Sequence, residues 1–107
     1  MAKDKRRIIF DKTEISVVDM SGKNPVRINL TYDKIISIQL DRGFKKKFYF
    51  LKKECDRIMI KMRGRENPIP IYSVDDQYFE EYVSGLRKFA KDNRITLYDY
   101  LAKSEEK

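Results

Sequence analysis

One stretch best indicates the fold class of this 107-residue chain, namely Val26-Arg-Ile-Asn-Leu-Thr-Tyr-Asp-Lys-Ile-Ile-Ser-Ile-Gln-Leu40. Over residues 26–31 and again over 36–40, apolar side chains alternate with polar ones. A period of two is the pattern of a strand with one buried face. Tyr32-Asp33-Lys34 interrupts the alternation. The stretch therefore predicts two half-buried strands with a short break between them.

Working outward, strand-like segments divided by turn residues fill the rest of the first seventy or so residues. We expect these further strands at 7–10, 15–18, 47–51, 58–63 and 68–72. We expect turns at 11–13, 21–25, 54–56 and 64–67, and a hairpin tip at Arg42-Gly43. Pro68 and Pro70 lack N–H donors, which places the last strand at a sheet edge or next to a bulge.

The period changes after Tyr72. Six apolar residues recur at helical spacing, namely Phe79, Tyr82, Val83, Leu86, Phe89 and Ala90. Ser73 with Asp76 has the form of a capping box, which predicts Ser73 as the N-cap. Asn93 is the expected left-handed C-cap. Gly85 costs about 1 kcal/mol relative to Ala inside a helix, so we expect a close approach to the sheet there.

The last residues have a weaker pattern. Thr96 and Asp99 resemble a second capping box, so residues 97–102 are expected to form one or two short helical turns. Residues 104–107 should fray.

The length suits a single domain over residues 1–107, because two domains of half this size would each be marginal. We expect its core at about 6–93, a short C-terminal extension over 94–103, and frayed termini. About seven antiparallel strands must curl or stack to hide their edges. The expected fold is therefore α+β, a small barrel or two-sheet sandwich capped by one C-terminal amphipathic helix, with a possible short extra helix at the end.

This order of elements resembles the pleckstrin-homology-like domain, including its small bacterial and GRAM-type members. Residues 28–40 are similar to the phrase of strand, polar step and Ile-x-x-Ile-like strand in those domains. Residues 79–89 match the helix that closes their barrel, and the resemblance covers about 6–92. An SH3-like or Sm-like barrel, as a rival, would have a shorter or differently placed helix.

The resemblance implies a non-catalytic scaffold that binds phosphoinositides, proteins or peptides. Phosphoinositide-binding members typically carry a Lys and a Lys/Arg-x-Arg pattern across the first hairpin. Here that hairpin is Asp11-Lys12-Thr13-Glu14, with as many acids as bases. Because of this departure, no site residues are transferred from the family.

Composition argues against catalysis. The chain has no His and one Cys, which excludes imidazole chemistry, an internal disulfide and a Cys cluster for a metal. Cys55 lies between Glu54 and Asp56, whose charges disfavour a thiolate, so we interpret it as an ordinary turn residue. The acidic pairs Asp75-Asp76 and Glu80-Glu81 suit helix capping and the helix dipole better than a metal. We expect no enzyme, no cofactor and no metal.

One charged segment stands out. Residues 42–65 hold ten bases and two acids, a net charge of +8, whereas the rest of the chain sums to −1. Strand alternation puts Lys45 and Lys47 on one face, and Lys61 and Arg63 on one face of the next strand. The candidate anion- or partner-binding residues are Arg42, Lys45, Lys46, Lys47, Lys52, Lys53, Lys61, Arg63 and Arg65. The alternative is a solvated face that keeps sheet edges apart and the domain soluble.

The N-terminus offers three apolar residues in a row, 8–10, far short of a signal peptide core or of the roughly 20 that a membrane span needs. We therefore expect a cytoplasmic protein. The hypothesis favoured by the sequence is a non-catalytic interaction module with a protein partner or self-association. The alternative is a binder of nucleic acid or acidic lipid through residues 42–65.

Overall fold

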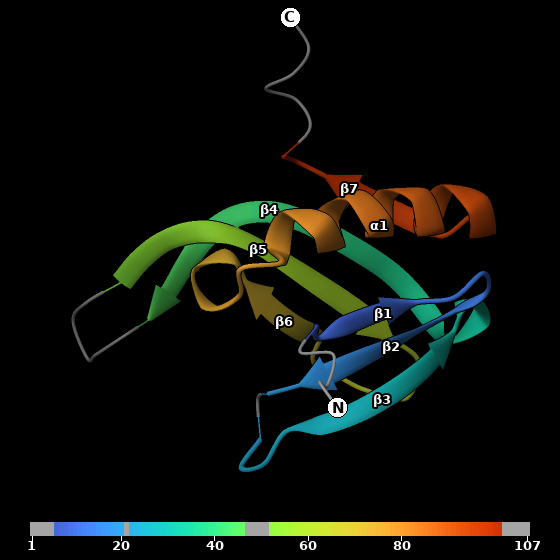
Figure 1. Ribbon diagram of the computed structural model, residues 1–107, viewed down its shortest axis with the longest axis horizontal. Helices are drawn as coiled ribbons and strands as arrows, with labels where there is room; N and C mark the ends of the chain where they lie inside the picture. Colours follow the sequence, from blue (N-terminus) through green and yellow to red (C-terminus); the bar gives the residue numbers. More distant parts are fainter. Residues whose placement is uncertain (1–5, 21, 47–51, 102–107) are drawn as a thin grey trace, which may run out of the picture.

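The computed structural model describes residues 6–20, 22–46 and 52–101, and it contains two sheets and one α-helix (Figure 1). The first sheet is antiparallel in the order β1-β2-β3, with β1 at Ile8–Phe10, β2 at Glu14–Asp19 and β3 at Val26–Thr31. The second has the order β6-β5-β4-β7 and is formed by β4 (Ile35–Lys46), β5 (Lys52–Met62), β6 (Ile69–Tyr72) and β7 (Thr96–Asp99). The α+β class and the two-sheet arrangement are confirmed. The barrel is wrong, because the two sheets remain separate and open.

The alternating stretch that opened the sequence analysis forms β3 and the first part of β4, and the 3₁₀-helix η1 (Tyr32–Lys34) separates them. Leu30, Ile38 and Leu40 are fully buried, as the alternation predicts. Ile36 is 43% exposed instead, and its neighbour Ile35 is buried. The register with β5 shifts between Ile35 and Ser37, and this bulge turns Ile36 to the outside.

Strands β4 and β5 form a longer ribbon than expected. The predicted hairpin tip at Arg42-Gly43 and the turn at residues 54–56 are wrong, because both lie inside strands with Gly43 opposite Cys55. Two ion pairs join residues directly opposite each other on successive rungs of the ladder, Arg57 with Asp41 and Arg42 with Asp56. Cross-strand pairs of opposite charge stabilise a ladder, which outweighs the weak turn signal of one glycine. The strand predicted at 47–51 lies outside the described residues.

Strand β6 occupies the edge of its sheet, with Pro70 opposite Met59, which confirms the position inferred from its prolines. The 3₁₀-helix η2 (Ser73–Asp75) follows, and α1 spans Phe79–Asn93. The N-cap prediction is wrong: Tyr78 precedes the helix, and the Ser73 hydroxyl accepts the Asp56 N–H instead. The left-handed C-cap is Arg94, with φ 58°, one residue after Asn93.

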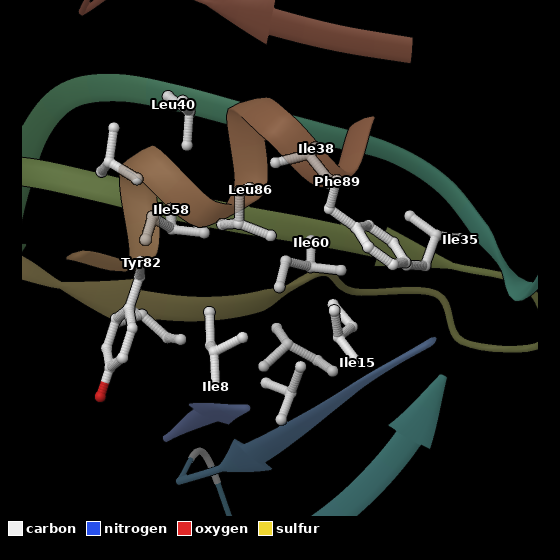
Figure 2. Packing of buried hydrophobic residues seen from close by; sticks show 14 of the residues in the cluster. Ile8, Ile15, Ile35, Ile38, Leu40, Ile58, Ile60, Tyr82, Leu86 and Phe89 are labelled. Atoms are coloured by element: carbon white, nitrogen blue, oxygen red, sulfur yellow. The ribbon is translucent and has the colours of Figure 1, made fainter. Parts of the chain in front are cut away.

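All six residues of the predicted helical stripe are buried. The helix contacts β1, β4 and β7 and so closes one open end between the sheets. Figure 2 shows Tyr82, Leu86 and Phe89 of α1 packed among isoleucines of both sheets. A Cβ at Gly85 would lie 2.4 Å from a ring carbon of Phe10, so the helix does approach a β1 side chain closely at this glycine.

The expected C-terminal helical turns are wrong. Thr96–Asp99 forms β7, which pairs parallel with β4, so the second sheet is mixed rather than wholly antiparallel. The Arg87 guanidinium on α1 holds Asp99 at 2.7 Å, and the Tyr100 N–H donates to Leu40 O. Leu97 and Leu101 pack against the core. Residues 96–99 therefore form a strand because they pair with the open edge of β4, although their local sequence favours the start of a helix.

Candidate interaction surfaces

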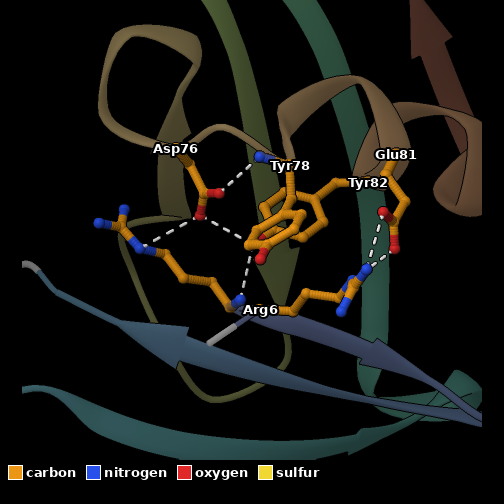
Figure 3. Close-up of polar contacts among 6 residues, drawn as sticks. Arg6, Asp76, Tyr78, Glu81 and Tyr82 are labelled. Carbon is orange, nitrogen blue, oxygen red and sulfur yellow. Dashed lines mark hydrogen bonds and ion pairs between the residues drawn. The ribbon is translucent and has the colours of Figure 1, made fainter. Parts of the chain in front are cut away.

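The acidic residues around the start of α1 have structural roles. Asp76 Oδ2 accepts the Tyr82 hydroxyl proton at 2.7 Å, and Asp76 Oδ1 accepts the Tyr78 N–H at 2.9 Å (Figure 3). The same tyrosine oxygen accepts the Arg7 N–H at 2.7 Å, which ties the N-terminal strand to the helix. Burial, together with the Asp76 carboxylate, raises the pKa of Tyr82 to about 12.

A second contact in the same region involves Arg6. Its guanidinium lies 4.4 Å from the centre of the Tyr78 ring, and its Nε is 2.6 Å from Glu81 Oε2. A cation over an aromatic face is favourable by about 0.5–1 kcal/mol at an exposed site. Glu81 and Asp76 therefore both serve to hold the segment before β1 against α1.

Cys55 lies in strand β5 and is buried, so the predicted turn at this residue is wrong. Among the residues that the structure describes, no three Cys, Asp or Glu side chains gather in a way that could hold a metal ion. No helix in the described ranges is long and apolar enough to cross a membrane.

The basic segment is divided by the β4–β5 register. At the end of the ribbon farthest from η1, which we call its distal end, Lys45 is opposite Lys53 and Lys46 is opposite Lys52. Four lysine positions thus occupy two successive rungs. The register therefore brings four positions of like formal charge together at this end of the ribbon. Lys47 lies outside the described residues.

Three arginines of the basic segment, two on the ribbon and one in the turn after β5, contact carboxylates. Arg42 lies 3.1 Å from Glu54 and 2.8 Å from Asp56, and Arg57 donates two hydrogen bonds of 2.9 Å to Asp41. The Arg57 guanidinium holds the pKa of Asp41 below its usual range, and the hydrogen bonds that Arg42 donates to Asp56 and Glu54 raise the pKa of Arg42. Arg65 pairs with Asp19. These arginines have their charge largely compensated within the fold.

The other candidates lie at the opposite end of β5. Lys61 is exposed and pairs in register with Ser37, while Arg63 donates to Asp33 O at 2.8 Å. Eight residues of strand, about 26 Å, separate Lys61 from Lys53. The described members of the predicted basic cluster are therefore spread along the ribbon rather than gathered at one point.

Sequence analysis did not predict the outer face of the four-stranded sheet. Here "outer face" means the side away from α1, where the register aligns Tyr98, Gln39, Met59 and Pro70 in one row across all four strands. Tyr98 is 47% exposed, and Tyr100 beyond it is 57% exposed. In the next row Asp41 and Arg57 lie beside Tyr72. Only the β7 pairing, which local sequence does not reveal, completes this surface.

A hollow of about 430 Å³ lies between the β1–β2 turn and α1. Its walls are Phe10, Phe89 and Gly85, and its rim carries Lys12, Lys88, Asp11 and Asp92. The charges of the rim balance, and Lys88 pairs with Asp92 at 2.8 Å. The hollow thus combines two aromatic side chains with charged residues whose formal charges sum to zero.

In comparison with known proteins, no family model, no curated protein and no solved structure matches the chain.

Proposed function

We propose that this chain is a non-catalytic interaction module, related to pleckstrin-homology-like domains, that binds a protein partner. Two sheets with one helix at their open end support the relationship, although β7 adds a parallel strand after the helix. The outer face of the four-stranded sheet carries the proposal. Within the described residues, α1 packs against the opposite side of this sheet, and no helix covers the row of Tyr98, Gln39, Met59 and Pro70.

The residue types on this face fit a protein partner. Tyrosine, methionine and arginine are enriched in protein–protein interfaces, whereas lysine and glutamate are depleted. The outer face carries Tyr98, Met59 and Arg57, and Arg57 is already paired with Asp41. A paired guanidinium can be covered by a partner at a lower desolvation cost than an uncompensated charge.

Affinity capture with matched variants tests this proposal. The tagged full chain, Tyr98→Lys and Met59→Lys are incubated with lysate of the source organism, and the recovered proteins are quantified by mass spectrometry. Ser84→Lys is the control, because Ser84 is exposed on α1 and the charge change is the same. We expect proteins that the parent chain and Ser84→Lys recover equally and that both outer-face variants lose. Equal recovery by all four chains, or no specific protein from any, would refute the proposal.

A second candidate is anion binding by the distal β4–β5 ribbon, favoured by the opposition of Lys45 to Lys53 and of Lys46 to Lys52. The probes are a fluorescent single-stranded oligonucleotide and phosphatidylserine vesicles, each titrated from 50 to 300 mM salt. Three or four phosphate contacts predict a slope of log affinity on log salt of about −2 to −3 for the oligonucleotide.

The decisive variant replaces Lys45, Lys46 and Lys47 with Glu. Its control replaces Lys12, Lys88 and Lys91 with Glu, which makes the same change in net charge on another part of the molecule. Loss of binding in the first variant alone supports the ribbon. Salt-independent binding, or equal loss in both variants, counts against it.

A further inference from the structure

Strand β3 is one of the two edge strands of its sheet, at the opposite edge from β1, and Figure 1 shows it along the border of the molecule. The Tyr32 N–H donates to Thr13 O at 2.8 Å, and Thr31 is opposite Glu14. In an antiparallel ladder this makes Glu14–Thr31 a pair whose own main-chain groups point away from each other. The N–H and C=O groups of Arg27, Asn29 and Thr31 therefore face away from β2.

This edge lacks the usual protection. Natural edge strands carry prolines, lysines or bulges that prevent pairing with another chain. The edge strand β6 contains Pro70, whereas β3 contains neither proline nor lysine. Its one charged side chain, Arg27, donates to Ser16 Oγ at 2.6 Å and to Arg6 O at 3.2 Å. The guanidinium thus lies back over its own sheet and leaves the edge open.

We propose that β3 pairs antiparallel with β3 of a second copy of this chain, with Asn29 opposite Asn29 on the twofold axis. In this register Arg27 is opposite Thr31, so all three outward-facing residues of each strand form hydrogen-bonded pairs. Each such pair can exchange two bonds, but the C=O of Thr31, the N-cap of η1, already accepts the first bond of that turn, which leaves about four bonds across the axis. The two three-stranded sheets become one continuous sheet.

The composition of β3 fits a copy of itself. With Asn29 on the axis, no like charges are opposed, whereas a shift of two residues along each strand would place Arg27 opposite Arg27. Val26 and Tyr32, which are 55% and 47% exposed, come opposite each other at both ends of the pairing. A twofold interface of this kind is closed, because the same surface is used on both copies. It also leaves the outer face of the other sheet free.

Disulfide trapping tests the register. Asn29→Cys is made in a Cys55→Ala background, which removes the natural thiol. Hydrogen-bonded antiparallel pairs have Cα atoms about 5.5 Å apart, inside the 4.4–6.8 Å range of disulfides. Thr31→Cys in the same background is the control, because its copy would lie four residues away, about 14 Å. We expect a covalent dimer for Asn29→Cys and none for Thr31→Cys on a non-reducing gel after mild oxidation.

Sedimentation of the natural chain and of Asn29→Lys gives an independent readout. We expect a concentration-dependent dimer in the natural chain and at least a tenfold weaker dimer in Asn29→Lys, because two lysines would meet on the axis. Thermal stability of dilute Asn29→Lys should be unchanged, since Asn29 is exposed. A natural chain that stays monomeric to 0.5 mM, or equal cross-linking at positions 29 and 31, would overturn the proposal.

Discussion

The hydroxyl of Tyr82 offers the sharpest test of how the fold is held together. Tyr82 is fully buried, and its oxygen donates to Asp76 Oδ2 and accepts the Arg7 N–H, both at 2.7 Å. Tyr82→Phe removes one oxygen and leaves the ring in place. The perturbation therefore separates the hydrogen bonds from the packing of the aromatic side chain.

The expected cost follows from the two lost bonds. A hydrogen bond to a charged group contributes about 1.5–3 kcal/mol, and an N–H left without an acceptor adds to the loss. We expect Tyr82→Phe to lower the free energy of unfolding by about 2–3 kcal/mol. For a domain of this size, that corresponds to a decrease in Tm of about 10 °C.

Tyr78→Phe is the matched control. It removes the same oxygen four residues earlier, where no hydrogen bond joins the Tyr78 hydroxyl to a described residue, so we expect a change under about 0.5 kcal/mol. Urea unfolding followed by circular dichroism measures both variants at pH 7. A Tyr82→Phe value within 0.5 kcal/mol of the natural chain, or equal to that of Tyr78→Phe, would refute the reasoning.

The pH dependence gives a second signature. The pKa of Tyr82 is about 12 in the fold against 10.0 for an ordinary tyrosine, so the unfolded chain releases this proton first. The stability contributed by the neutral hydroxyl is complete below pH 10 and is lost as pH rises towards 12. The gap between the natural chain and Tyr82→Phe should therefore narrow over this interval, and a constant gap would contradict the assignment.

Three further predictions concern glycines and β7. Gly85→Ala adds a Cβ 2.4 Å from the Phe10 ring, so it should destabilise the natural chain. In a Phe10→Ala background the clash is absent, and the same substitution should stabilise the fold by up to about 1 kcal/mol through helix propensity. A change in stability of the same sign in both backgrounds would contradict this. Gly43→Ala places a methyl group 2.5 Å from Arg57 Cζ and should displace the guanidinium from Asp41. The pKa of Asp41, measured by NMR titration, should then rise towards 3.8. The decrease in the free energy of unfolding on acidification below about pH 4 should become smaller than in the natural chain. Gly22→Ala, with open space around the added methyl group, should change neither quantity. Asp99→Asn weakens the contact with Arg87 and should speed amide exchange in β7 more than in β5; uniform exchange would exclude a local role.

Several elements were predictable because a helix or strand that is buried on one face has apolar residues at regular intervals in its sequence. The stripe from Phe79 to Ala90 and the alternation of Leu30, Ile38 and Leu40 are each buried as expected. Gly85 was also predictable, since a glycine inside a helix is tolerated where another side chain needs the space. In each case the evidence is local, within a few residues of the chain.

The errors share a different cause. The Arg42-Gly43 turn signal is overridden by ion pairs with residues of another strand, and Thr96–Asp99 becomes a strand only because β4 offers an edge. The opposition of Lys45 to Lys53 likewise depends on a register that the charge count over residues 42–65 does not contain. These outcomes rest on contacts between segments far apart in the chain.

Local patterns along the chain therefore suffice to predict the α+β class, the buried stripe of α1, and the concentration of positive charge between residues 42 and 65. The position of that charge, the open face of the four-stranded sheet and the unprotected edge of β3 depend on how the strands pair in the folded chain. The physical reason is that periodicity and charge are properties of neighbouring residues, whereas register and edges arise only when distant strands pair.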